Sequence, residues 1–222
     1  MQQGRKPVIV CPKSGLLCES PQFFSRENVS FRCPASSSLI IRGLDACRRP
    51  GLTKKETILS CTEFPGWISI PANLLNESGQ IWLRESEEKS RPLLIRQLQD
   101  GIYPHPFVID DGSRRRLHFS LKLVQSEMRL DAPDSLEIAY TRAMMGFLLF
   151  HPRPKHVVIV GLGGGSLTKY CYRQFARCRV TTVELMEGVI ACRDWFRVPP
   201  DDERLKIVQA DAADHFAGEA DG

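Results

Sequence analysis

A run of closely spaced glycines follows a short β-branched stretch in the second half of the chain. The stretch His156 to Val160 (HVVIV) breaks into Gly161, Gly163 and Gly165, and Ser166 follows. Buried parallel strands end in this way where a backbone loop approaches a nucleotide-like ligand and a helix begins. The pattern therefore predicts a nucleotide or nucleoside site at this loop.

Two carboxylates occupy matching places further along. Glu184 follows a predicted strand from Arg179 to Val183, and Asp211 follows one from Leu205 to Ala210. A carboxylate about 20 residues after such glycines can accept hydrogen bonds from both ribose hydroxyls, and the next can accept one from an adenine amine. Alone, each carboxylate also fits a helix cap or a solvated loop, and the glycines fit a tight turn. Their joint placement at three strand ends favours a ligand site.

The glycine spacing discriminates between ligands. Gly161 to Gly165 has the form G-x-G-x-G, but Ser166 stands where the dinucleotide fingerprint has Gly or Ala. This form argues against NAD and is typical of folds that bind S-adenosylmethionine.

The elements around this loop alternate between strand and helix. Besides the three strands, we expect helices from Ser166 to Phe175 and from Glu187 to Phe196. Such alternation predicts a parallel sheet covered by helices, with ligands at the carboxyl ends of the strands. The predicted fold class is α/β, with a partial Rossmann-like sheet of the methyltransferase type over residues 151–222.

A β-hairpin and a helix are expected over residues 104–150, as a small domain before the sheet. Residues 117–123 alternate apolar and polar side chains, and the turn residues 110–113 precede them, so residues 106–124 read as a hairpin. Apolar residues from Leu136 to Phe147 recur at helical spacing after an Asp-Ala-Pro-Asp start at residues 131–134.

Residues 1–103 show few regular patterns and are treated as an N-terminal region of unknown structure. Pro, Gly and Ser interrupt most apolar runs. Short strands are expected at Pro7 to Val10 and Ser38 to Ile41, and a helix around Leu93 to Gln99.

Composition sets further bounds. The 222 residues are 42% hydrophobic and 25% charged, with no stretch near the ~18 apolar residues of a membrane span and no secretory signal. The eight cysteines lack paired metal-ligand spacing, which favours reduced thiols in a cytoplasmic protein without a metal; zinc ligation by the five cysteines before residue 62 is the alternative. The net charge of +4 and the Arg114-Arg115-Arg116 cluster fit a solvated turn better than a nucleic-acid surface.

Several motifs occur in a consistent order over roughly residues 104–222. They are Gln125-Ser126, Tyr140, His151-Pro152, VVIVGLGGGSL, Val183-Glu184 and Ala210-Asp211-Ala212. Together they resemble the spermidine/spermine synthase family of polyamine aminopropyltransferases. The resemblance implies transfer of an aminopropyl group from decarboxylated S-adenosylmethionine to a small-molecule amine. By it, Gln125 and Glu184 contact the donor nucleoside, Asp211 contacts its adenine, and Tyr140 lies near the acceptor.

The chain departs from the family pattern at acidic positions. Ser166 follows the glycines where the family commonly has Asp, and the family's D-E-x-x-Y-H-E reads L-E-I-A-Y-T-R here, with Arg142 at the final acidic position. Amines with two or more positive charges need carboxylate partners to leave water, so these changes weaken the polyamine assignment.

The sequence also stops where the family's fourth strand would begin. That strand and its loop normally supply the aspartate that accepts the amine proton, so no catalytic residue is assigned. We expect a truncated sheet of three strands with an open edge and an uncovered apolar face, and impaired transfer unless a homo-oligomer or another chain completes it. The alternatives are an S-adenosylmethionine-dependent methyltransferase-like protein and a non-catalytic nucleoside-binding fragment.

Overall fold

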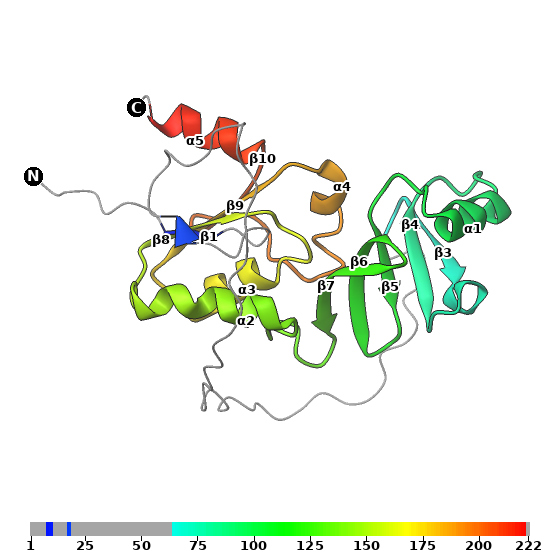
Figure 1. Cartoon of the computed structure of the whole chain (residues 1–222), viewed down its shortest axis with the longest axis horizontal. Helices are drawn as coiled ribbons and strands as arrows, with labels where there is room; N and C mark the ends of the chain where they lie inside the picture. Colours follow the sequence, from blue (N-terminus) through cyan, green and yellow to red (C-terminus); the bar gives the residue numbers. More distant parts are fainter. Residues whose placement is uncertain (1–7, 11–16, 19–63, 221–222) are drawn as a thin grey trace, which may run out of the picture.

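The computed structural model describes residues 8–10, 17–18 and 64–220. The fold is mixed α/β, with an antiparallel sheet and a parallel sheet that lie next to each other (Figure 1). None of the helices in the described part of the chain has the length and apolar character that a membrane span requires. The predicted strand Ser38 to Ile41 lies outside the described residues.

The antiparallel sheet has five strands in the order β3-β4-β5-β6-β7. The predicted hairpin is confirmed, because β5 pairs with β6 and Val108 lies opposite Leu117. Its turn is closed by side chains, since Gly112 N donates to Asp110 Oδ1 at 2.8 Å and Ser113 N donates to Asp111 Oδ1 at 2.9 Å. The strands are β3 (Trp67–Pro71), β4 (Gln80–Arg84), β5 (Phe107–Asp110), β6 (Arg114–Ser120) and β7 (Leu123–Arg129).

The sheet begins well before residue 104, where the sequence pattern placed the start of this region. β3 and β4 pair in register, with Ile68 opposite Leu83 and Ile70 opposite Ile81, and all four side chains are buried. Both strands are only five residues long and lie among turn residues, so the strand pattern is weak in the sequence. The division of the chain into domains stays a prediction.

The predicted helix near residues 93–99 is confirmed as α1 (Arg91–Asp100). Pro92 stands in its first turn, and Gly101 ends it with a φ of +70°. Leu94 and Leu98, one turn apart, pack into the core of the antiparallel sheet.

The parallel sheet confirms the predicted strand-helix alternation. The strands β8 (His156–Val160), β9 (Arg179–Glu184) and β10 (Leu205–Gln209) are parallel and adjacent. Helix α3 (Ser166–Gln174) lies on one face of the sheet and α5 (Ala212–Ala220) on the other (Figure 1). Alternate residues of β8 serve the two faces, since Val157 packs with Leu167 of α3 and Val158 with Phe216 of α5.

The prediction that the sheet has an open edge beside β8 is wrong. β1 (Val8–Val10) runs parallel to β8 there, with Val8 opposite Val157 and Val10 opposite Ile159, and β2 (Leu17–Cys18) extends the order to β10-β9-β8-β1-β2. In a doubly wound sheet this place belongs to the fourth strand, which follows the third along the chain. Here the apolar segment Val8–Val10, near the start of the sequence, occupies the position of the fourth strand. This pairing is favourable because it buries the side chains of Ile9 and Val10. The face expected to be bare is covered by α5.

Two predicted helices are shorter than expected. Helix α2 (Ala139–Met144) continues as a 3₁₀ turn over Met145–Leu149 but does not start near Pro133, because Ser135 N and Oγ both bond to Ala132 O. Such local bonds of serine compete with a helix start. Helix α4 (Glu187–Ile190) covers four residues only. Tight turns follow it and bury the large side chains of Trp195 and Phe196.

The arginine cluster is not the solvated turn that the sequence suggested. It lies within β6, and Arg115 is buried: its Nε donates to Asp110 Oδ2 at 2.7 Å and its guanidinium to Trp195 O at 2.8 Å. Arg116 pairs with Asp111, and Arg114 with Glu127.

Three cysteines pack as small hydrophobic side chains. Cys171, Cys178 and Cys192 are free and buried, and burial raises the pKa of Cys171 and of Cys192 to about 12. Cys11, Cys33, Cys47 and Cys61 lie outside the described residues, while Cys18 ends β2.

Candidate functional site

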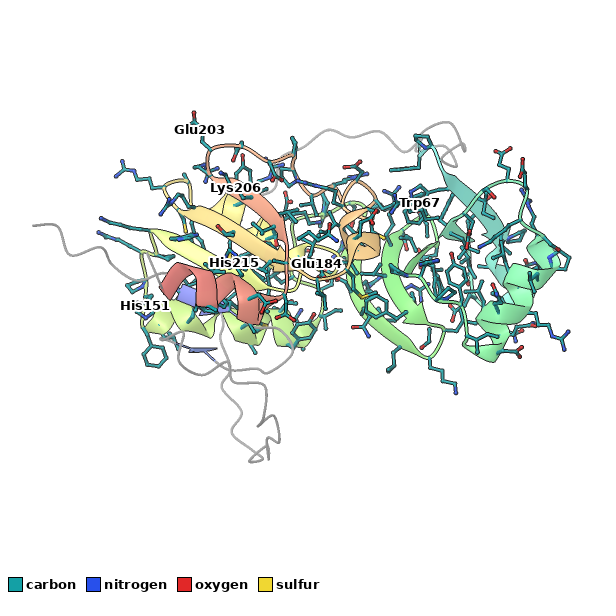
Figure 2. The ribbon with its side chains drawn as sticks, turned by 90° about the horizontal axis from the view of Figure 1, so that it is seen from above. Trp67, His151, Glu184, Glu203, Lys206 and His215 are labelled. Carbon is teal, nitrogen blue, oxygen red and sulfur yellow. The ribbon has the colours of Figure 1, made fainter. Side chains whose placement is uncertain are left out.

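A cavity of about 290 Å³ lies between the antiparallel sheet and the carboxyl ends of β8 and β9. Figure 2 places Glu184 in the middle of the molecule, where the two sheets meet. The carboxyl edge of a parallel sheet is where such folds bind ligands. The cavity is lined by Phe119, Val124, Gln125, Ser126, Tyr140, Thr141, Val160, Gly161, Leu162, Gly163, Ser166, Leu167, Glu184, Met186 and Val189.

Glu184 is the last residue of β9, and its side chain is held in one orientation. Its Oε2 accepts a hydrogen bond from Leu162 N at 2.7 Å, and its Oε1 accepts one from Met186 N at 2.9 Å. A carboxylate has about four acceptor sites, so both oxygens keep capacity for a ligand. The carboxylate is therefore preorganised to accept bonds from a pair of hydroxyls.

The glycine loop folds back on the end of β9. Gly161 N donates to Val183 O at 2.7 Å, and Gly161 and Gly163 both line the cavity. Gly165 does not line it. Gly165 precedes α3 with a φ of +67°, and a Cβ there would lie 2.3 Å from Val198 Cγ2. Its role in this structure is a tight strand-to-helix connection, the alternative that the sequence left open.

The antiparallel sheet and α2 contribute the opposite wall. Gln125 and Ser126 come from β7, and Ser126 Oγ lies 3.5 Å from Ser166 Oγ at the start of α3. Tyr140 and Thr141 come from α2, where Thr141 Oγ1 donates to Ile138 O at 2.6 Å. Burial raises the pKa of the Tyr140 hydroxyl, which is therefore a protonated donor at neutral pH.

Asp211 lies outside the cavity lining. Its exposed Oδ1 accepts a hydrogen bond from Ala213 N at 2.8 Å, so it caps the start of α5. The structure thus brings five of the predicted site residues to one cavity and leaves Gly165 and Asp211 elsewhere. The five are Gln125, Tyr140, Gly161, Gly163 and Glu184.

Sequence comparisons find curated proteins that are similar to part of the chain. No protein-family model matches the chain. Over 122 residues it is 38% identical to a polyamine aminopropyltransferase of Chromobacterium violaceum, covering 53% of this chain and 47% of that protein. Over 124 residues it is 38% identical to the polyamine aminopropyltransferase of Neisseria meningitidis, covering 55% and 47%. Over about half of its length, the chain is similar to polyamine aminopropyltransferases.

The chain spans about half the length of these curated proteins. It is also 34% identical over 88 residues to the eEF1A lysine and N-terminal methyltransferase of Xenopus laevis, a match that covers 36% of this chain and 13% of that protein.

Two solved structures are similar to parts of the chain. A probable spermidine synthase from Corynebacterium glutamicum matches with a TM-score of 0.39 and 21% identity, covering 48% of this chain and 42% of that one. Human methyltransferase-like protein 13 in complex with SAH matches with a TM-score of 0.35 and 26% identity, covering 38% and 41%.

One buried residue behind the cavity has no signal in the sequence. Lys169 of α3 donates from Nζ to Pro133 O at 2.6 Å, to Phe196 O at 2.7 Å and to Met128 Sδ at 3.1 Å. Burial lowers its pKa to about 8. A lysine within a helix reads as a solvated residue, whereas this one ties α3 to β7 and to the loops around it.

Among the described residues, no group of three or more His, Cys, Asp or Glu side chains could hold a metal ion.

Proposed function

We propose that the cavity binds an adenosine-type nucleoside carrying a sulfur substituent, and that the chain serves aminopropyl transfer from decarboxylated S-adenosylmethionine to an amine. The supporting observation is the Glu184 carboxylate, held by two backbone amides beside the glycine loop. A ribose diol is a neutral pair of donors that suits a fixed carboxylate. The similarity to polyamine aminopropyltransferases supports the type of donor.

We assign each cavity residue a proposed contact with the donor or the acceptor. Glu184 accepts the ribose hydroxyls, Gly161 and Gly163 let the backbone approach the nucleoside, and Gln125 contacts it from β7. Tyr140 offers a hydroxyl from α2 near the acceptor. Asp211 caps α5 and is not among these contacts. We assign no catalytic residue.

In the proposed reaction the acceptor amine nitrogen attacks the aminopropyl carbon that is bound to the sulfonium sulfur of the donor. A C–N bond forms as the C–S bond breaks, and the sulfur keeps the electron pair and leaves as a neutral thioether nucleoside. The amine then loses a proton, a step that general bases accelerate. Since Ser166 and Arg142 stand where the family resemblance expects carboxylates, we expect transfer by this chain to be slow.

Calorimetric titration of the chain with methylthioadenosine tests the nucleoside site. We expect saturable binding, which Glu184→Gln weakens by roughly tenfold or more, because one carboxylate acceptor is lost. Glu203→Gln is the matched control, since Glu203 is exposed and outside the cavity lining. Absence of binding, or equal binding by Glu184→Gln, overturns the proposal. Product analysis with each donor then separates aminopropyl transfer from methyl transfer.

A further inference from the structure

A buried ammonium group in α3 connects three segments that are distant in sequence. Nζ of Lys169 donates hydrogen bonds to Pro133 O at 2.6 Å and to Phe196 O at 2.7 Å. It also donates to Met128 Sδ at 3.1 Å. Met128 belongs to β7, a strand of the antiparallel sheet that contacts α3 (Figure 1). Pro133 lies between β7 and α2, and Phe196 follows α4, so one side chain holds all three segments against α3.

Two of the segments that this ammonium group holds pack closely on the glycine loop. A Cβ on Gly164 would lie 2.9 Å from Cδ1 of Phe196 and 2.7 Å from Oγ of Ser126 in β7. A Cβ on Gly165 would lie 2.3 Å from Cγ2 of Val198. The loop therefore has no space for even a methyl group on this side. Because such close packing transmits displacements, a shift of β7 or of the turn after α4 would move the loop or leave a gap beside it.

The glycine loop and β7 both line the proposed nucleoside site. Gly161, Gly163 and Ser166 line the cavity from the loop and from α3, and Ser126 lines it from β7. Oγ of Ser126 lies 3.5 Å from Oγ of Ser166, so the two walls approach each other here. Ser126 and Met128 are two residues apart in β7, point to the same face and are both buried. The sulfur contact of the ammonium group is therefore made on the face of β7 that meets the loop.

Stability alone does not explain a lysine at this position. Lys169 is 1% exposed, and its carbonyl and thioether partners carry no formal charge. Removing an ammonium group from water is costly, and a well-packed apolar side chain in such a place is often at least as stable. An apolar side chain could not, however, fix the two carbonyl groups in position. The specific contribution of the lysine is thus the geometry of the segments that it binds.

We propose that Lys169 is a positioning residue of the nucleoside site, which fixes β7 and the turn after α4 against the glycine loop. This inference rests on the proposed function, because it concerns ligand binding in the same cavity. Lys169 is not among the residues that line the cavity, so it acts without touching the ligand. Loss of its hydrogen bonds should weaken binding more than an equal loss of stability elsewhere in the molecule.

Calorimetric titration with methylthioadenosine, below the melting temperature of every variant, compares Lys169→Met with a destabilised control. We expect Lys169→Met to weaken binding roughly fivefold or more, because both carbonyl hydrogen bonds are lost. Leu94→Ala is the control, since Leu94 is buried in the core of the antiparallel sheet and outside the cavity lining. It should lower the melting temperature with little change in binding. A smaller loss of binding in Lys169→Met, or an equal loss in Leu94→Ala, overturns the inference.

Lys169→Arg tests whether donation from this position sets the site. The guanidinium keeps donors for the two carbonyls, so we expect methylthioadenosine binding closer to that of the wild type than to that of Lys169→Met. Binding no tighter than that of Lys169→Met overturns the inference. If Lys169→Met does not fold, Lys169→Gln, a shorter neutral side chain, takes its place in both comparisons.

Hydrogen exchange of the unliganded chain gives a readout that is independent of the proposed function. Mass spectrometry should find faster exchange over residues 161–167 in Lys169→Met than in the wild type or in Leu94→Ala. Unchanged exchange over these residues overturns the inference even if methylthioadenosine binds. Failure of the wild type to bind methylthioadenosine overturns the proposed function, and the exchange comparison still decides whether Lys169 holds the loop.

Discussion

The Glu184 carboxylate accepts a hydrogen bond from the backbone amide of Leu162 at 2.7 Å, across the ends of two neighbouring parallel strands. The same carboxylate accepts a second bond from Met186 N. The group proposed to bind the ribose therefore also ties the glycine loop to β9. Ligand affinity and local stability are expected to change together when it is altered.

Glu184→Ala is expected to lower the free energy of unfolding by about 1–3 kcal/mol, because it leaves the Leu162 amide without its buried acceptor. For a chain of this size that is a decrease in melting temperature of roughly 2–4 °C per kcal/mol. Thermal unfolding followed by circular dichroism measures it. Glu203→Ala, a substitution at an exposed position, should have the same melting temperature as the wild type. Equal melting temperatures of the Glu184 and Glu203 variants would show that the hydrogen bond from Leu162 N to Glu184 contributes nothing to stability.

Lys169 is expected to give stability a distinct pH dependence. Its folded pKa is lowered from 10.5 to about 8, so between these values the unfolded chain binds more protons than the folded one. Stability from this group therefore increases as pH rises from about 8 to 10.5. The difference in unfolding free energy between wild type and Lys169→Met should shift in favour of the wild type between pH 7.5 and pH 10, as measured by urea unfolding. The raised pKa values of the buried thiols cancel in this comparison because both proteins carry them. A difference that is constant with pH would contradict a lowered pKa.

Local sequence patterns predicted individual helices and strands, but they did not predict which strands pair when the segments lie far apart in the sequence. The β5–β6 hairpin and the strand His156 to Val160 follow from alternation and from a glycine loop, both of which are local. The place of β1 depends on contact between residues 8–10 and 157–159, which no pattern within either segment encodes. Asp211 shows a finer limit. Its position at a strand end was predictable, but the same position also starts α5, and its side chain caps that helix.

The buried cysteines are expected to resist alkylation. Burial raises the pKa of Cys171 and Cys192 to about 12, so almost no reactive thiolate forms at pH 8. Iodoacetamide labelling followed by peptide mass spectrometry should find both residues unmodified in the native chain and modified in urea. Cys178, also buried and with a raised pKa, should behave in the same way. Rapid native labelling of any of the three would contradict the packing around α3, β9 and α4.

The N-terminal strand is expected to stabilise the parallel sheet although it lies far from that sheet in sequence. Ile9 is buried against Val158, Val183 and Phe216, so Ile9→Asp places a carboxylate in an apolar layer. We expect a loss of several kcal/mol and faster hydrogen exchange of the β8 amides, measured by mass spectrometry.

Leu74→Asp is the matched control for this strand, because it introduces the same carboxylate at a leucine that is 52% exposed. Its effect on stability should stay within about 0.5 kcal/mol, as for other surface substitutions. If β1 holds the place beside β8, exchange should increase over residues 156–160 in Ile9→Asp and stay unchanged in the antiparallel sheet, which shares no strand with β1. Equal hydrogen exchange of the β8 amides in both variants would mean that the sheet does not depend on β1 at that edge. Another segment could then occupy the position beside β8 that the fourth strand has in a doubly wound sheet.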